Sequence, residues 1–219
     1  MTPMKEDYLK MIFELGGVSE KVSNKQLSLS LDIAAASVTE MINKLVEEKL
    51  VSHTPYAGIS LTATGRRAAE ELVRKHRLWE CFLFDKLNYS LANVHQEAEK
   101  LEHSSSDQMI DQLDVFLDHP AHCPHGGAIP DREGHYDEGS RVALAAIADG
   151  QRVKLSRFVD NHDLLEYLES LNFAVDQDYV VTNHAPFEGP ITVQTDAGRT
   201  IDVSFKAANN IFVDDLSAS

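Results

Sequence analysis

Apolar residues recur every three or four positions in the N-terminal part of the chain, which is the spacing of one helix face. The first predicted helix covers residues 4–16, where Tyr8, Ile12 and Leu15 are apolar and two glycines end the pattern. A short second helix is capped by Ser23 or Asn24 and runs to Leu31. These segments predict a small helical domain with one buried core.

A longer helix follows at residues 35–48, with Val38, Ile42 and Leu45 on its apolar face. Two strand-like pieces come next, at 50–54 and 58–61, joined by a turn at Pro55-Tyr56-Ala57. The order helix, helix–turn–helix, two strands and a further helix is typical of a winged helix-turn-helix domain.

The middle of the chain predicts an all-α region. A helix from about residue 65 to 87, begun by Thr62 or Thr64, is apolar nearly all round at Leu78–Phe84, which indicates burial on two faces, one of them against a second protomer. Shorter helices are predicted at 94–104 and 106–117. Residues 119–141 are rich in Gly, Pro and charge and are expected to form a linker.

Beyond the linker the period changes from helical to alternating. Strands are predicted at 152–159, 179–182, 191–195 and 200–205, with one short helix at 163–171. The fold class predicted is therefore mainly α with β: a winged helix, an all-α dimerisation domain and an SH3-like β-barrel. The expected domain boundaries are 1–64, 65–140 and 141–219.

The net charge of −15 over 219 residues is unevenly distributed. Residues 1–75 carry 10 Lys+Arg and 10 Asp+Glu, so residues 76–219 hold the whole acidic excess. Such an excess keeps proteins soluble, and it also suits repulsion from DNA that bound cations would relieve. Two cysteines, no long apolar run and no secretion signal lead us to expect a cytoplasmic protein with reduced thiols and no membrane partner.

The second helix of the helix–turn–helix begins with small side chains, which let a helix approach a DNA groove closely. Polar residues lie on the side away from the apolar stripe, and the wing and the following helix add further contacts. The candidate DNA-binding residues are Lys25, Gln26, Ser37, Thr39, Glu40, Lys44, Tyr56 and Arg66. The alternative is a helical hairpin with a solvated polar face; the wing pattern that follows favours the DNA-binding interpretation over it.

The segment Glu99-Lys-Leu-Glu102-His103 places two carboxylates and an imidazole at i, i+3 and i+4, on one helix face. Mixed oxygen and nitrogen ligands suit a divalent cation, and Asp7 on the first helix offers a fourth ligand. Exposed helical Glu and His are common, so ordinary surface residues are the alternative. Position 99 is Glu, and the zinc-peptidase pattern His-x-x-Glu-His is therefore absent.

A second cluster is Cys123-Pro-His125, where a thiol and an imidazole two residues apart can face one transition metal. His76 and Glu80 lie at i, i+4 on the long helix. A buried, inert thiol is the alternative for Cys123, and core packing is the interpretation for Cys81.

Because of these motifs and their order, the whole chain resembles the diphtheria-toxin-repressor and manganese-transport-regulator family, especially its three-domain streptococcal-type members. Its C-terminal part is similar to the small iron-transport accessory protein, as Pro186-Phe-Glu-Gly-Pro and Ala208-Asn-Asn-Ile-Phe-Val indicate. The resemblance implies a non-enzymatic, homodimeric repressor that binds palindromic operators in double-stranded DNA. A metal-buffering or metal-delivery protein is the alternative, with the winged helix serving protein contacts.

The resemblance also implies two metal ions per chain. The implied ligands are Asp7, Glu99, Glu102 and His103 at one site and Glu80, Cys123, His125 and Asp160 at the other, with His76 a ligand in some relatives. Asp7 stands where iron-type members have a Met, so Mn²⁺ is expected, with Fe²⁺ the alternative and Zn²⁺ possible in vitro. Lys10 stands where two-domain manganese regulators have a Glu, which argues against a binuclear cluster.

Overall fold

The computed structural model describes residues 1–54, 57–137 and 139–216 and divides into two compact units. Unit 1 comprises Met1–His76, Lys100–Asp107 and Pro130–His135; unit 2 comprises Arg77–Glu99, Gln108–Ile129 and Tyr136–Ser219. The three domain boundaries predicted from the sequence remain predictions. None of the helices among the described residues combines the length and apolar character needed to span a bilayer.

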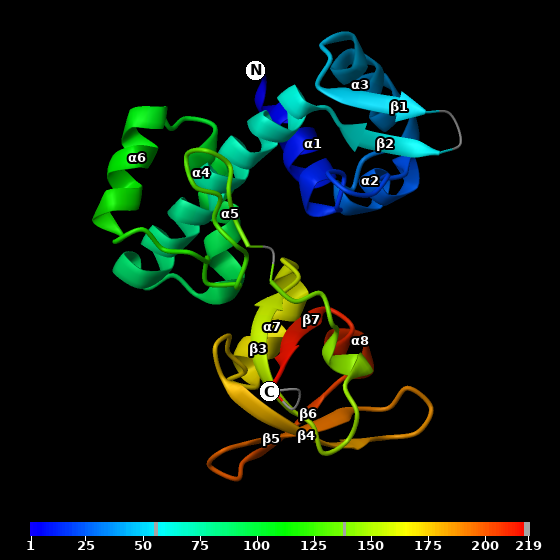
Figure 1. The fold of residues 1–219 in the computed structure, drawn as a ribbon, viewed down its shortest axis with the longest axis vertical. Helices are drawn as coiled ribbons and strands as arrows, with labels where there is room; N and C mark the ends of the chain where they lie inside the picture. The colour runs from blue at the N-terminus through cyan, green and yellow to red at the C-terminus, as the bar shows by residue number, and fades with distance from the viewer. Residues whose placement is uncertain (55–56, 138, 217–219) are drawn as a thin grey trace. The chain divides into compact units, whose positions relative to one another are not determined.

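Unit 1 contains the winged helix (Figure 1). Its elements are α1 (Pro3–Glu14), α2 (Asn24–Ser30), α3 (Ala35–Glu47), β1 (Val51–Thr54) and β2 (Gly58–Leu61). The two strands are antiparallel, with Val51 opposite Leu61. Leu9, Leu27 and Ile59 are fully buried between the helices and the wing, so the predicted apolar faces form one core.

The starts of the helices follow from their capping residues. Ser23 and Gln26 form a capping box, in which the Ser23 hydroxyl accepts from the Gln26 N–H at 3.2 Å and the Gln26 side chain accepts from the Ser23 N–H at 2.8 Å. The Thr62 hydroxyl accepts from the Gly65 N–H at 3.0 Å and donates to the carbonyl of Lys49 at 2.7 Å. Thr62 therefore begins the next helix and ties its start to the end of the preceding helix–strand connection.

Three helices form the middle of the chain: α4 (Ala63–Leu87), α5 (Leu91–Glu102) and α6 (Asp107–Phe116). Helix α4 begins in unit 1 and continues into unit 2, and the chain returns to unit 1 at Lys100, within the last turn of α5. The predicted linker contains no helix or strand among its described residues up to the short 3₁₀ turn Leu144–Ala146.

The C-terminal part of unit 2 is a five-stranded antiparallel sheet with strand order β6-β5-β4-β3-β7 (Figure 1). Its elements are β3 (Arg152–Phe158), α7 (His162–Ser170), β4 (Asp178–His184), β5 (Ile191–Thr195), β6 (Thr200–Val203), α8 (Phe205–Ala208) and β7 (Ile211–Asp215). Alternate residues such as Leu155, Val181 and Val193 are fully buried against α7. Leu91 and Ala92 at the start of α5 join the same core.

The predicted fold class is confirmed, with two corrections to the strands. The predicted strand 200–205 ends at Val203, because the Ser204 hydroxyl accepts from the Ala207 N–H at 3.2 Å and caps a short helix that includes Phe205. Strand β7 was not predicted. It pairs with β3, where Leu155 lies opposite Val213, and so closes one edge of the sheet.

Candidate metal centres

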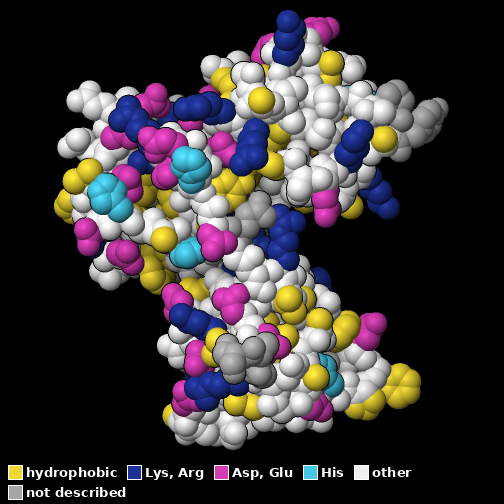
Figure 2. All heavy atoms as spheres, in the orientation of Figure 1, with side chains coloured by type: hydrophobic (Ala, Val, Ile, Leu, Met, Phe, Trp, Pro, Cys, Tyr) yellow, Lys and Arg dark blue, Asp and Glu magenta, His cyan; other side chains and the backbone are white. Residues whose placement is uncertain are grey.

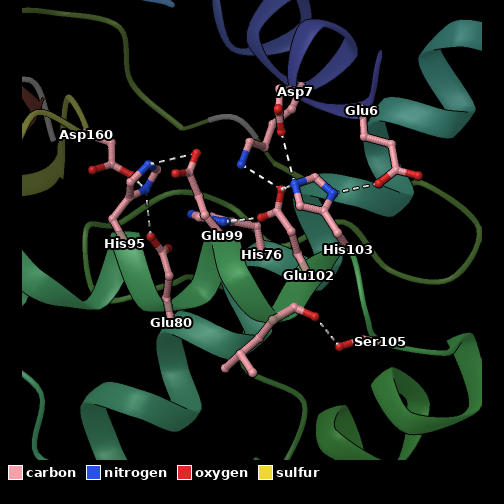
Figure 3. Close-up of polar contacts among 12 residues, drawn as sticks. Glu6, Asp7, His76, Glu80, His95, Glu99, Glu102, His103, Ser105 and Asp160 are labelled. Carbon is pink, nitrogen blue, oxygen red and sulfur yellow. Dashed lines mark hydrogen bonds and ion pairs between the residues drawn. The ribbon is translucent and has the colours of Figure 1, made fainter. Parts of the chain in front are cut away.

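The first candidate centre lies within unit 1, where α1 meets the end of α5. The His103 ring has Nε2 at 3.0 Å from Asp7 Oδ1 and at 3.6 Å from Glu102 Oε1 (Figure 3). Its Nδ1 lies 2.6 Å from Oε2 of Glu6. One ligand atom each from Asp7, Glu102 and His103 lies within 4.8 Å of the others, which fits a single ion with oxygen and nitrogen ligands.

Glu102 is held by two further groups. Its side chain is fully buried; Oε1 accepts from Lys10 Nζ at 2.8 Å, and Oε2 pairs with Nδ1 of the buried His76. Burial raises the pKa of Glu102, but the hydrogen bond with His76 and the charges of His76 and Lys10 outweigh it and lower the pKa below its ordinary value. The carboxylate is therefore ionised, with one oxygen on Lys10 and the other on His76.

Glu99 was predicted to share an ion with Glu102 and His103, but its carboxylate contacts a different histidine, His95. Its carboxylate is half-exposed and sits 3.6 Å from Nε2 of His95, one turn earlier on α5. Its place as a ligand remains a prediction from spacing. Glu6 and His95 were missed as candidates, although Glu6 adjoins Asp7 and the His95–Glu99 spacing equals that of Glu99 and His103.

The second candidate centre lies within unit 2. Glu80 comes from α4, while Cys123 and His125 come from the loop after α6, and all three are buried. Nδ1 of His125 is 3.2 Å from Glu80 Oε1 and 3.9 Å from Cys123 Sγ. Ligand atoms of the three residues lie within 4.8 Å of one another, and a thiol, an imidazole and a carboxylate suit a transition metal.

The tautomer of His125 follows from its other nitrogen. Nε2 lies 3.0 Å from the carbonyl oxygen of Leu91, which can only accept, so Nε2 carries the hydrogen. In the neutral ring Nδ1 then presents its lone pair toward Glu80 and Cys123. This arrangement orients His125 as a metal ligand would be oriented, with a backbone carbonyl as the partner of its other ring nitrogen.

Asp160 and His95 complete the polar surroundings of the second centre. Oδ2 of Asp160 lies 3.9 Å from Nδ1 of His125 and pairs directly with Nδ1 of His95 (Figure 3). The same His95 nitrogen is 3.5 Å from Glu80 Oε1. The structure thus brings together the four residues implied by the resemblance and adds His95 to them.

The charges of this cluster favour a bound cation. Burial lowers the pKa of His95, but hydrogen bonds with Asp160, Glu80 and Glu99 raise it overall to about 12. Burial and the negative charge of Glu80 raise the pKa of the Cys123 thiol. Burial lowers the pKa of His125, but chiefly the charge of Glu80 raises it overall to about 12. Without a metal the Cys123 thiol and the His125 imidazole are therefore protonated, and a metal ion would replace those protons.

The loop that carries Cys123 and His125 is fixed by its backbone. The Gly126 N–H donates to the carbonyl of Cys123 at 2.8 Å, and the N–H of Phe158 donates to the carbonyl of His125 at 2.9 Å. Gly126 has φ +81°, and a Cβ there would overlap the carbonyl oxygen of Ser156 and lie 2.9 Å from Cα of Arg157. Glycine is thus required for the loop to dock on β3.

The predicted DNA-contact residues lie on the surface of unit 1. All of the described ones are exposed: Lys25, Gln26, Ser37, Thr39, Glu40, Lys44 and Arg66. Some of them also have local partners, since Lys44 pairs with Glu40 at 2.7 Å and Arg66 with Glu70 at 2.6 Å. Tyr56 lies outside the described residues. Figure 2 shows basic side chains spread over the winged helix, and histidines next to acidic side chains on the helical part.

Comparisons with known proteins identify each part of the chain. Residues 1–59 match the iron dependent repressor N-terminal DNA binding domain, residues 62–131 the iron dependent repressor metal binding and dimerisation domain, and residues 142–215 the FeoA domain. An HTH-type transcriptional regulator of Methanocaldococcus jannaschii is 32% identical over 54% of this chain and 95% of its own length. The diphtheria toxin repressor of Corynebacterium diphtheriae is 29% identical over 68% of this chain and 70% of its own length.

Solved structures match over nearly the full length. A manganese-dependent transcriptional repressor in complex with manganese is 37% identical, covers 97% of this chain and 100% of its own, and has a TM-score of 0.89. The manganese regulator SloR is 40% identical, covers 98% and 100%, and has a TM-score of 0.83. ScaR with bound Cd²⁺ is 37% identical, covers 96% and 98%, and has a TM-score of 0.82.

Proposed function

This chain belongs to the family of metal-dependent, DNA-binding transcriptional repressors that includes the diphtheria toxin repressor and MntR, and we propose that Mn²⁺ is its corepressor. The observation that carries the proposal is the meeting of Asp7, Glu102 and His103 within unit 1. Asp7 belongs to the first helix of the DNA-binding domain, and the other two residues lie at the end of α5. An ion held by all three would join these segments.

The proposed mechanism follows from the packing of α1. Helix α1 packs against α2 and β2, and α2 packs against α3, so holding α1 restricts, through α2, the helix that reads DNA. Mn²⁺ would neutralise the clustered carboxylates and stabilise this arrangement. It strengthens DNA binding only to the extent that it binds the DNA-competent conformation better.

Manganese is favoured over iron by the ligands of the first centre, which are two carboxylates and an imidazole without a sulfur atom. The matched repressor structure that contains manganese supports the same choice. ScaR has been solved with Cd²⁺ and with Zn²⁺, so softer ions are expected to bind in vitro. Fe²⁺ remains the alternative corepressor.

A second ion per chain is proposed at Glu80, Cys123, His125 and Asp160, with His95 beside them. Support comes from the burial of the first three side chains and from the orientation of His125 by the Leu91 carbonyl. When bound, the metal would supply the positive charge that allows Cys123 to act as a thiolate. Glu99 stays a proposed ligand of the first centre, on the strength of its spacing from Glu102 and His103.

The DNA-bound form is proposed to be a homodimer on a palindromic operator. Residues 62–131 match a dimerisation domain, and apolar side chains on α4 and α6 are exposed in the single chain. These are Phe84, Leu87, Met109, Val115 and Phe116. Such a face suits burial against a second copy. Two recognition helices would then meet successive major grooves.

The test is a Mn²⁺ titration of operator binding, measured by fluorescence anisotropy on a palindromic fragment from upstream of a metal-transporter gene. Parent protein should bind about 5-fold to 150-fold more tightly with Mn²⁺ than without it. Glu102→Gln keeps the size of the side chain but removes its charge, and it should lose this response. Glu97→Gln removes the same charge from the same helix and should retain it. Equal responses of the two variants would refute the proposal.

A further inference from the structure

Lys10 is a buried cation next to the first centre. It is 3% exposed, and its ammonium lies 2.8 Å from Oε1 of Glu102. Lys10 and Asp7 are three residues apart on α1, so both side chains face the end of α5. Lysine is almost never fully buried unless it is paired, which marks this contact as specific.

Both oxygens of Glu102 are engaged by protein groups. Oε2 pairs with His76, and Oε1, which binds Lys10, is also the oxygen nearest the ring of His103, at 3.6 Å from Nε2. Oε1 of Glu102 therefore contacts the ammonium of Lys10 and also lies near His103, which groups with Asp7 and Glu102. A metal ion that binds Asp7, Glu102 and His103 must therefore bind a Glu102 carboxylate that already pairs with the Lys10 ammonium.

We propose that Lys10 is a tethered cation that holds Glu102 when metal is absent, competes with Mn²⁺ for that carboxylate and so sets the metal concentration at which the first centre fills. The inference rests on the proposed function, because it requires that Asp7, Glu102 and His103 bind the metal. Either the ammonium withdraws from Oε1 when the ion arrives or the two cations share the carboxylate. Both cases make binding weaker than it would be without the charge of Lys10.

The same contact stabilises the metal-free protein. Removal of one partner from a buried ion pair leaves an uncompensated charge, which strongly destabilises the fold. Loss of Lys10 should therefore change two measurements in opposite directions: Mn²⁺ binding becomes tighter, and the metal-free protein melts at a lower temperature. A lysine that only supports packing would give the lower melting temperature without tighter binding.

The experiment measures Mn²⁺ binding directly, from the electron paramagnetic resonance signal of the free ion. All variants carry Cys123→Ala, which is proposed to silence the second centre. Lys10→Met should lower the Kd by about tenfold or more, since it removes a like charge next to the ion. Lys5→Met is the matched control: it removes the same charge from α1, but Lys5 pairs with Glu48. It should change the Kd by less than about twofold.

Lys10→Arg provides an independent outcome if Lys10→Met fails to fold. A guanidinium keeps the charge and binds a carboxylate with two parallel N–H groups, so it should compete more strongly and raise the Kd several-fold. Unchanged or weaker Mn²⁺ binding by folded Lys10→Met, or unchanged binding by Lys10→Arg, would overturn the inference.

Glu102→Gln in the same background separates this inference from the proposed function. If Glu102→Gln binds Mn²⁺ as tightly as the parent, the first centre itself is refuted. If Glu102→Gln loses the ion while the Lys10 variants bind like the parent, the centre stands and the competition by Lys10 is rejected.

Discussion

Replacement of Gly126 by alanine should separate the loop of the second centre from β3. Gly126 has φ +81°, and its missing Cβ is what allows the loop to lie against Ser156 and Arg157. Alanine in this left-handed backbone conformation destabilises the folded protein by about 1–2 kcal/mol. Relief of the overlap moves the loop and breaks the Phe158 to His125 backbone hydrogen bond, at a cost of about 1 kcal/mol.

The expected loss of stability for Gly126→Ala is therefore about 2–3 kcal/mol, which lowers the melting temperature by about 5–10 °C in a chain of this size. The displaced loop also carries Cys123 and His125. Metal ligands must stay within about 0.5 Å of their productive positions, so the variant should bind one Mn²⁺ fewer per chain. Differential scanning calorimetry and calorimetric Mn²⁺ titration measure the two effects.

Gly198→Ala is the matched control, because Gly198 has φ +80° but no atom within 4 Å of the position of a Cβ. It should show only the backbone cost of about 1–2 kcal/mol and keep the parent metal stoichiometry. The reasoning fails if Gly126→Ala and Gly198→Ala melt at the same temperature and bind the same number of ions.

Three further outcomes are expected. Cys123→Ala should bind one Mn²⁺ fewer per chain in calorimetry, and an unchanged stoichiometry would make Cys123 a buried structural thiol. Because the pKa of the ligand His125 is raised to about 12 and that of the Cys123 thiol is also raised, Mn²⁺ must displace protons from these ligands. Its affinity should rise about tenfold per pH unit for each proton released, and equal binding enthalpies in buffers of different ionisation enthalpy would contradict this. Ser23→Ala removes the cap of α2 and should lower the free energy of unfolding, measured in urea, by about 1 kcal/mol. A change near zero would show that the cap does not stabilise the protein.

Local signals in the sequence account for much of the fold. Ser23 and Thr62, each one of two candidate caps in the sequence, are the residues that begin the helices, because a cap depends on residues within one turn. Strand β7 was missed because its assignment depends on pairing with β3, more than fifty residues earlier in the chain. Phe205 was placed in a strand because its apolar character continued the alternation, while the cap formed by Ser204 ended it.

In the candidate centres too, the sequence predicted residues that share a helix but not contacts between distant parts of the chain. Spacing brought out Glu102 and His103, which share one end of a helix, but the direction of the Glu99 side chain depends on His95 and could not be derived from spacing. No local pattern pointed to Asp160, which entered through the family resemblance. The contact between Lys10 and Glu102 joins residues 92 positions apart, so only the folded chain reveals it.

The sequence separation within the first centre also orders events during synthesis. The wing closes the N-terminal core at Leu61, whose N–H donates to the carbonyl of Gly17 at 2.9 Å, whereas the contact between Glu6 and His103 spans 97 residues. At about 5–20 residues per second, the ribosome adds the intervening 40 or so residues in about 2–8 s. During that interval the nascent DNA-binding domain can fold, but it lacks Glu102 and His103. Under the proposed function, metal control begins only later in translation, when these residues have left the exit tunnel.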